Sequence, residues 1–308
     1  MPVPIWLDCD PGHDDVIAIF LAAQRSDLIG ISVVSGNAPL TFTERNGLTA
    51  CQVAGLTTPV HRGAARPLVR PAQHAEYIHG ESGLDGPAIP ALTRKASGVP
   101  AVRALLDAAE KHAGLWVVAV GPLTNVALAL LLEPGLAQRL AGISVMGGTW
   151  GPGNVTAAAE FNVWADPEAA QLVLEAGANV VLAGLDLTHQ FVMDRGRIAQ
   201  IRALGTRTAL FSADLLDYFA AAYARSYGGP ALGPLHDPCS VLAVTDPHLF
   251  ASEPRHVAVE CAGELTRGMT VVDRRTGPRV LPPNATVLTN IDHEAAFQVL
   301  MDALGASL

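Results

Sequence analysis

DCDPGHDD, residues 8–15, separates an apolar, strand-like segment at 5–7 from a helical pattern at 16–23. This order places four carboxylates in one strand-to-helix turn. Like charges so close together raise one another's pKa and destabilise the loop unless a cation neutralises them. The turn therefore predicts a bound divalent metal, and hard carboxylate ligands favour Ca²⁺ or Mg²⁺ over zinc. Helix capping alone would explain one or two of these carboxylates but not four.

Along the rest of the first half of the chain, short β-branched runs alternate with longer helical patterns. Such alternation indicates βαβ units and a parallel sheet. We therefore predict an α/β fold with an open, mostly parallel, Rossmann-like sheet flanked by helices. The expected strands are 5–7, 31–35, 59–61, 116–120, 143–146 and 180–183, and the expected helices are 14–25, 41–54, 100–113, 122–132 and 167–176.

The second half of the chain is less regular. A long helix is expected at 206–225, and strands near 255–260, 269–274 and 286–289 would form a small additional sheet or extend an edge. No linker rich in Ser or charge and no repeat interrupts the sequence, which favours a single domain over 1–308. The stretch 62–98, which contains His79, is expected to be a long loop over the sheet edge, and loops of that length are usually functional.

Composition narrows the class of partner. Half of the residues are hydrophobic, 16% are charged and the net charge is −9, which disfavours nucleic acid and anionic membranes as partners. The four cysteines form no CxxC pair, so reduced thiols are expected. With neither a signal peptide pattern nor an apolar run of membrane-spanning length, we expect a cytoplasmic protein.

Polar residues follow most of the predicted strands. Gly36-Asn37, 121–125 and 146–148 come directly after strands, as does the aspartate cluster. In an open parallel sheet these carboxyl ends share one edge, where ligands bind. Glycines there allow close backbone approach, so a carbonyl oxygen such as that of Thr124 could complete a metal shell.

Two further segments fit the same site. Gly153-Asn154 with 160–162, and the run 235–238, carry Asn, Glu, His and Asp side chains. A carboxylate that accepts and amides that donate hydrogen bonds suit sugar hydroxyls, which implies a carbohydrate-like substrate. Asp237 alone would be interpreted as a helix N-cap, but beside His236 it is the better candidate for a further metal ligand.

Taken in order, these motifs resemble the nucleoside hydrolases of the inosine-uridine-preferring type over most of the chain. The resemblance implies Ca²⁺ as cofactor, a nucleoside as substrate and a homodimer or homotetramer. The implied metal ligands are Asp10, Asp15, the Thr124 carbonyl and Asp237. The implied ribose ligands are Asp14, Asn37, Met146, Asn154, Glu160 and Asn162.

The resemblance also implies a mechanism. Cleavage of an N-glycosidic bond needs a nucleophile, stabilisation of a ribosyl oxocarbenium ion and protonation of the departing base. Ca²⁺ would lower the pKa of a water, Asp10 would accept its proton, and His236 would protonate the base. The presence of His236 argues against the purine-specific branch of the family.

The base pocket is predicted from a helix. Tyr223 and Tyr227 lie four residues apart, so both rings could face the departing base, with Tyr227 assisting His236. The alternative is that both are half-buried helix residues without a role in chemistry. His79 and Phe161 complete the predicted substrate-binding set.

Two other functions compete with this one. An Mg²⁺-dependent phosphatase of the haloacid-dehalogenase type would also have a DxD motif after its first strand, but Pro11-Gly12 and the lack of an evident phosphate-binding lysine or arginine argue against it. A non-catalytic Ca²⁺-dependent sugar-binding module would leave His236 and a water-activating carboxylate without purpose.

Overall fold

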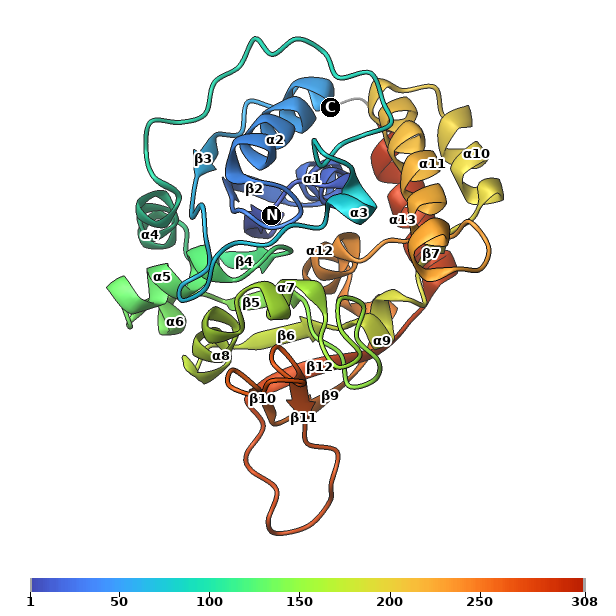
Figure 1. The fold of residues 1–308 in the computed structure, drawn as a ribbon. Coiled ribbons are helices and arrows are strands. Elements are labelled where there is room, and N and C mark those ends of the chain that lie inside the picture. Colours follow the sequence, from blue (N-terminus) through green and yellow to red (C-terminus); the bar gives the residue numbers. More distant parts are fainter. Residues whose placement is uncertain (1, 307–308) are drawn as a thin grey trace.

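The computed structural model describes residues 2–306 and has at its centre an eight-stranded sheet in the order β3-β2-β1-β4-β5-β6-β12-β9 (Figure 1). All neighbours pair in parallel except β12 and β9, which are antiparallel. The strands are β1 (Pro4–Cys9), β2 (Asp27–Val33), β3 (Val60–Arg62), β4 (Trp116–Ala119), β5 (Gly142–Met146), β6 (Val180–Ala183), β9 (Phe250–Arg255) and β12 (Ala285–Ile291). The predicted open, mostly parallel sheet is confirmed.

Helices cover both faces of this sheet (Figure 1). Side chains alternate along β1, so that Ile5 and Leu7 join one hydrophobic cluster and Trp6 joins the other. The first cluster packs against α1 (His13–Arg25), α2 (Leu40–Ala54), α10 (Arg195–Ala203), α11 (Arg207–Tyr227), α12 (Asp237–Thr245) and α13 (His293–Gly305). The second packs against α4 (Ala101–Lys111), α5 (Thr124–Leu132), α6 (Leu136–Arg139) and α8 (Pro167–Glu175).

The strand order reverses beside β1. From β1 the chain proceeds to β2 and β3 on one side, and it returns to add β4, β5 and β6 on the other. Such a reversal opens a crevice at the carboxyl ends of the two central strands, and ligands of open α/β sheets bind there. The turn at 8–15 leaves the end of β1 and therefore lies at this crevice.

The remaining elements are small. β10 (Val257–Val259) and β11 (Thr270–Val272) form an antiparallel pair, as do β7 (Val192–Met193) and β8 (Gly233–Pro234). The additional β element expected in the second half is thus present, while β9 and β12 extend the main sheet. The short helices are α3 (Glu76–His79), α7 (Phe161–Ala165), α9 (Leu185–Thr188) and a 3₁₀ turn (Pro247–Leu249).

The stretch expected to be a long loop contains α3, which carries Tyr77, Ile78 and His79 toward the crevice. The chain after α3 runs around the outside of α2 before it reaches α4 (Figure 1). Gln52 of α2 holds this outer path, because its side chain donates to the Ala91 carbonyl and accepts from the Thr93 backbone N–H. Among residues 2–306, no helix is long and apolar enough to cross a membrane.

Candidate active site

One cavity lies at the crevice, and every residue predicted to bind substrate lines it. These are Asp14, Asn37, His79, Met146, Asn154, Glu160, Phe161, Asn162, Tyr223 and Tyr227, joined by His236 and Asp237. The other residues of the predicted site, Asp10, Asp15 and Thr124, are buried and do not line it. Segments from α1 to α12 are thus brought together, as expected from strand ends that share one edge.

Carboxylates cluster at the end of the cavity nearest β1. Asp14, Asp15 and Asp237 each place an oxygen within 4.8 Å of the others. Asp10 lies against this group, since its backbone N–H donates to Asp15 Oδ1 over 3.1 Å. Burial is the largest cause that raises the pKa of all four carboxyl groups, that of Asp14 to about 7.

Glycines shape the space around Asp10. A Cβ on Gly36 would lie 2.0 Å from Asp10 Oδ2, and one on Gly121 would lie 2.5 Å from Asp10 Oδ1. The small turns after β2 and β4 are therefore required for this carboxylate to fit. Asn37 fixes it by donating its backbone N–H to Oδ2 over 2.7 Å.

The donor set fits a divalent cation. Asp10 Oδ1 is buried without a hydrogen-bond partner among residues 2–306, although the oxygen is an acceptor with full bonding capacity. None of the four carboxylates forms an ion pair with a Lys or Arg side chain in the described part of the chain. Buried carboxylates without a basic partner are stabilised by a hard cation with oxygen ligands.

Asp8, the first aspartate of the motif, is not part of the carboxylate cluster that the other three form with Asp237. Its Oδ1 accepts hydrogen bonds from the Ser32 hydroxyl and, over 2.8 Å, from the Asn125 amide. Asn125 in turn accepts the Ala64 backbone N–H over 2.8 Å. Asp8 therefore ties β1 to β2 and α5, a structural role that the spacing of the motif alone could not separate from metal binding.

Amides and one carboxylate line the side of the cavity that would hold a sugar. Glu160 caps α7, and its two oxygens accept the backbone N–H groups of Asn162, Val163 and Gly148 over 2.8 to 3.1 Å. Burial raises the pKa of Glu160 to about 7. Asn154 Oδ1 accepts the Phe161 backbone N–H over 2.9 Å, which leaves the Asn154 NH₂ group available to a ligand.

The expectation that the amides donate to the sugar is wrong for Asn162. Its NH₂ group donates to the Val120 and Met146 carbonyls, over 2.8 and 3.2 Å. The NH₂ group of Asn37 is used in the same way, on the Asp10 carbonyl and on Asp15 Oδ2, over 3.1 Å each. Both side chains therefore offer a carbonyl oxygen, an acceptor for hydroxyl groups.

Aromatic and histidine side chains also line the cavity. The ring centroids of Tyr223 and Tyr227 are 4.5 Å apart, and the ring centroids of Tyr223 and His236 are 6.4 Å apart. His236 Nδ1 lies 2.7 Å from the Thr188 hydroxyl, and burial lowers the pKa of His236 to about 3. His79 stacks on Phe219, which contacts Tyr223, and its Nδ1 lies 3.0 Å from that of His13.

Sequence reasoning missed some residues of this cavity. Tyr77 lines it beside Tyr227, but it comes from a helix of four residues that no periodicity reveals. Phe219 lies one helical turn before Tyr223 on α11, so the i, i+4 spacing that pointed to the tyrosines could have found it.

The family model of the inosine-uridine preferring nucleoside hydrolases matches residues 5–298. The chain belongs to this family. It is 42% identical over 310 aligned positions to the pyrimidine-specific ribonucleoside hydrolase RihA of Escherichia coli K12, with 99% of each chain covered. This nucleoside hydrolase is therefore a nucleoside N-glycosidase, and neither the phosphatase nor the sugar-binding alternative is favoured.

Solved structures of nucleoside hydrolases have the same fold. A plant enzyme, PpNRh1, superimposes with a TM-score of 0.92 at 29% identity, with 99% of this chain and 100% of that one covered. A purine-preferring ribonucleoside hydrolase from Gardnerella vaginalis gives 0.91 at 31% identity, with 98% of each covered. The named relatives thus differ in the base they prefer, while the fold is shared.

Proposed function

We propose that this nucleoside hydrolase uses Ca²⁺, held by Asp10, Asp15, Asp237 and the backbone carbonyl of Thr124, to cleave ribonucleosides into free base and ribose. The observation that carries the proposal is the buried carboxylate group at one end of a cavity lined with sugar-binding side chains. A bound Ca²⁺ would lower the pKa of a water and chelate ribose hydroxyls. The clustered oxygens include one of Asp14, which we assign to ribose on the resemblance to the family.

Asp10 is the base in this proposal. Its Oδ2 is held by the Asn37 backbone N–H, while Oδ1 accepts no hydrogen bond from a described residue and has lone pairs both for the metal and for the proton of a water. The rigid placement between Gly36 and Gly121 means that little reorganisation is needed when the proton moves.

Ribose recognition follows from the orientation of the amides. The carbonyl oxygens of Asn37 and Asn162 and the Glu160 carboxylate would accept hydrogen bonds from hydroxyl groups, and Asn154 would donate. Acceptor oxygens around the ring also favour positive charge on the sugar, which develops in the transition state and not in the ground state.

The leaving base would depart toward the histidine and tyrosine side of the cavity. To protonate the base, His236 would have to carry both ring protons, with Nδ1–H donated to the Thr188 hydroxyl and the Nε2 proton transferred to the base, which leaves a neutral ring. Tyr227 is proposed to assist through Tyr223, whose ring lies between those of Tyr227 and His236 in the chain of ring contacts. With His236 in place, we propose that hydrolysis is not restricted to purine nucleosides.

The test is a panel of purine and pyrimidine ribonucleosides in which released ribose and released base are both quantified. We expect equimolar products, loss of activity after chelation and recovery with Ca²⁺. Phosphate esters serve as the control for phosphatase activity. Full activity in a chelated preparation shown by elemental analysis to contain no divalent metal would overturn the proposed mechanism.

A further inference from the structure

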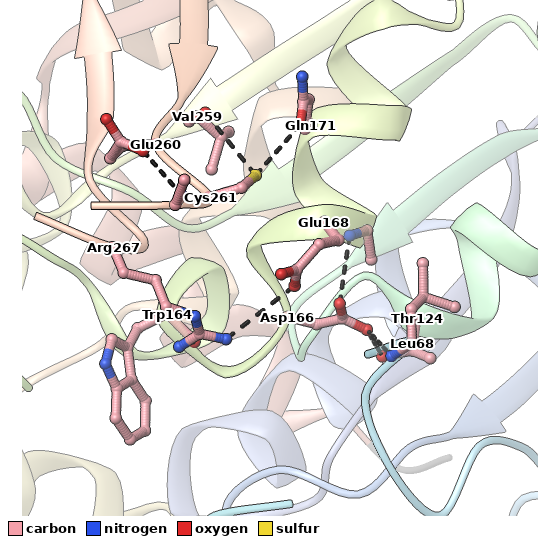
Figure 2. Close-up of polar contacts among 12 residues, drawn as sticks. Leu68, Thr124, Trp164, Asp166, Glu168, Gln171, Val259, Glu260, Cys261 and Arg267 are labelled. Carbon is pink, nitrogen blue, oxygen red and sulfur yellow. Dashed lines mark hydrogen bonds and ion pairs between the residues drawn. The ribbon is translucent and has the colours of Figure 1, made fainter. Parts of the chain in front are cut away.

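The Asp166 carboxylate joins three segments that are distant in sequence (Figure 2). Its Oδ2 accepts the Thr124 hydroxyl over 2.6 Å and the Leu68 backbone N–H over 3.0 Å. Its Oδ1 accepts the Ala169 backbone N–H over 3.2 Å at the start of α8. The side chain is completely buried, so water does not compete for these bonds.

Two of these segments border the proposed metal site. The turn that leads from β4 to Thr124 contains Gly121, against which the Asp10 carboxylate packs. The segment that contains Leu68 continues to His74 and Ala75, which bond to the Gly36 and Asn37 carbonyls over 3.1 and 3.2 Å. Both turns that confine Asp10 are thereby connected to Asp166.

Helix capping does not account for this arrangement. An N-cap needs one oxygen on the first-turn N–H groups, and Oδ1 supplies it. The shorter bond, to Thr124, uses the other oxygen, which faces away from α8 toward α5 and the 62–75 segment. A neutral cap with one acceptor atom would serve α8 equally well, whereas capping with one oxygen and accepting two donors at the other requires the two acceptor oxygens of a carboxylate.

The chain on both sides of Asp166 is also held in place. Arg267, in the turn between β10 and β11, donates to the Trp164 carbonyl over 3.0 Å and has a guanidinium nitrogen 4.0 Å from a Glu168 carboxylate oxygen (Figure 2). The short connection between α7 and α8 is thus held on both sides of Asp166. A carboxylate that is held this firmly can fix the positions of the groups that donate hydrogen bonds to it.

We propose that Asp166 is a positioning residue for the metal site, which holds the Thr124 turn and the 62–75 segment in the places that Ca²⁺ binding requires. This inference rests on the proposed function, because it assumes the metal site at Asp10, Asp15 and Asp237. Groups that hold a metal ligand in place by a hydrogen bond typically contribute 10- to 100-fold to metal affinity.

The test is Asp166→Asn, because asparagine can still cap a helix but has a single acceptor oxygen, so it cannot accept the α8 N–H and the two Oδ2 donors at once. The Ca²⁺ affinity of the chelator-treated protein is measured by titration calorimetry. We expect the Asn variant to bind Ca²⁺ about 10- to 100-fold more weakly, with an unchanged circular dichroism spectrum. Hydrogen exchange should also be faster at the Leu68 amide in the metal-free protein.

Three further variants separate positioning from capping. Thr124→Val should weaken Ca²⁺ binding as Asp166→Asn does, whereas Thr124→Ser should retain most of the affinity. The double variant Asp166→Asn/Thr124→Val should bind Ca²⁺ at least as tightly as the single variant that has the lower affinity. The matched control is Asp292→Asn, which makes the same change at the N-cap of α13. Its Ca²⁺ affinity should equal that of the wild type.

The outcomes distinguish this inference from the proposed function. If the wild type binds no Ca²⁺, the proposed function fails. If the wild type binds Ca²⁺ and Asp166→Asn binds it within twofold as tightly, Asp166 is only a cap and the positioning role is overturned. An equal loss of affinity in Asp292→Asn would likewise overturn it, since that change does not touch the site.

Discussion

Asp10 illustrates what a single residue requires of its surroundings. Its carboxylate lies between two glycines that belong to different strand-to-helix turns, and neither turn has room for a Cβ. The sequence shows the glycines and predicts tight turns, but it does not show that the same side chain fills both spaces. That fact depends on β1 lying between β2 and β4 in the sheet.

Gly121→Ala is expected to displace Asp10. The new Cβ would lie 2.5 Å from the carboxylate and 3.0 Å from the Asp10 backbone nitrogen, so the backbone itself must shift. A misplaced catalytic group commonly costs about 100-fold in kcat, which steady-state kinetics will measure. Gly135→Ala is the matched control, because a Cβ there meets nothing within 4 Å. Equal activities of the two variants would contradict the expected role of Gly121.

Asp10→Asn is expected to lower kcat by several orders of magnitude while the fold is retained. General-base catalysis alone contributes about 10²- to 10⁴-fold, and this residue is also proposed to bind the metal. Rates of base release are compared with the circular dichroism of each protein. A variant within tenfold of the wild type would place the base elsewhere.

His236→Ala should affect substrates according to their leaving group. Hydrolysis of inosine needs a proton on the base and should be severely impaired, whereas a nitrophenyl riboside releases a stable anion and should be largely spared. The kcat/KM values of both substrates provide the measurement. Since alanine keeps the backbone N–H that donates to Asp14 Oδ2 over 3.2 Å, equal losses on both substrates would show that the His236 side chain supports ribose or metal binding instead.

At the scale of elements, the sequence was most informative where a side chain pattern repeats. The βα alternation predicted the sheet, and the spacing of Tyr223 and Tyr227 placed both on one face of α11. Helix α3 was not predicted, since four residues contain too little periodicity to indicate a helix. The pairing of β12 with β6, about a hundred residues earlier in the chain, also has no local signal.

The contact between α3 and α11 leads to a prediction. Tyr77 and Tyr227 line the same cavity, and the Ser226 hydroxyl donates to the Tyr77 carbonyl over 3.3 Å. Tyr77→Phe removes the hydroxyl but keeps the ring. The loss of one hydrogen-bonding group costs about 1 kcal/mol, so we expect KM to rise by up to about fivefold with little change in kcat. A large fall in kcat with constant KM would indicate a role for Tyr77 in proton transfer.

At the scale of the whole molecule, the two hydrophobic clusters share one sheet. Neighbouring residues of β1 contribute to opposite clusters, so loss of one cluster removes the support of the other. The single domain over 1–308, expected from the absence of a linker, stays a prediction. The clustered carboxylates of the site lie at the end of β1. The stability of the site and that of the fold are therefore coupled.

Removal of the metal is therefore expected to destabilise the entire protein. Without a cation, the mutual repulsion and burial of four carboxylates oppose folding, whereas a ligand that binds only the folded state stabilises it by about 2.7 kcal/mol at 100 times its Kd. Scanning calorimetry should show a Tm several degrees lower after chelation, restored in a dose-dependent way by Ca²⁺. Gly135→Ala should respond as the wild type does, and Asp15→Ala should lose the response because it removes a proposed ligand. A Tm independent of Ca²⁺ in the wild type would mean that the folded protein tolerates the buried carboxylates by holding protons on them.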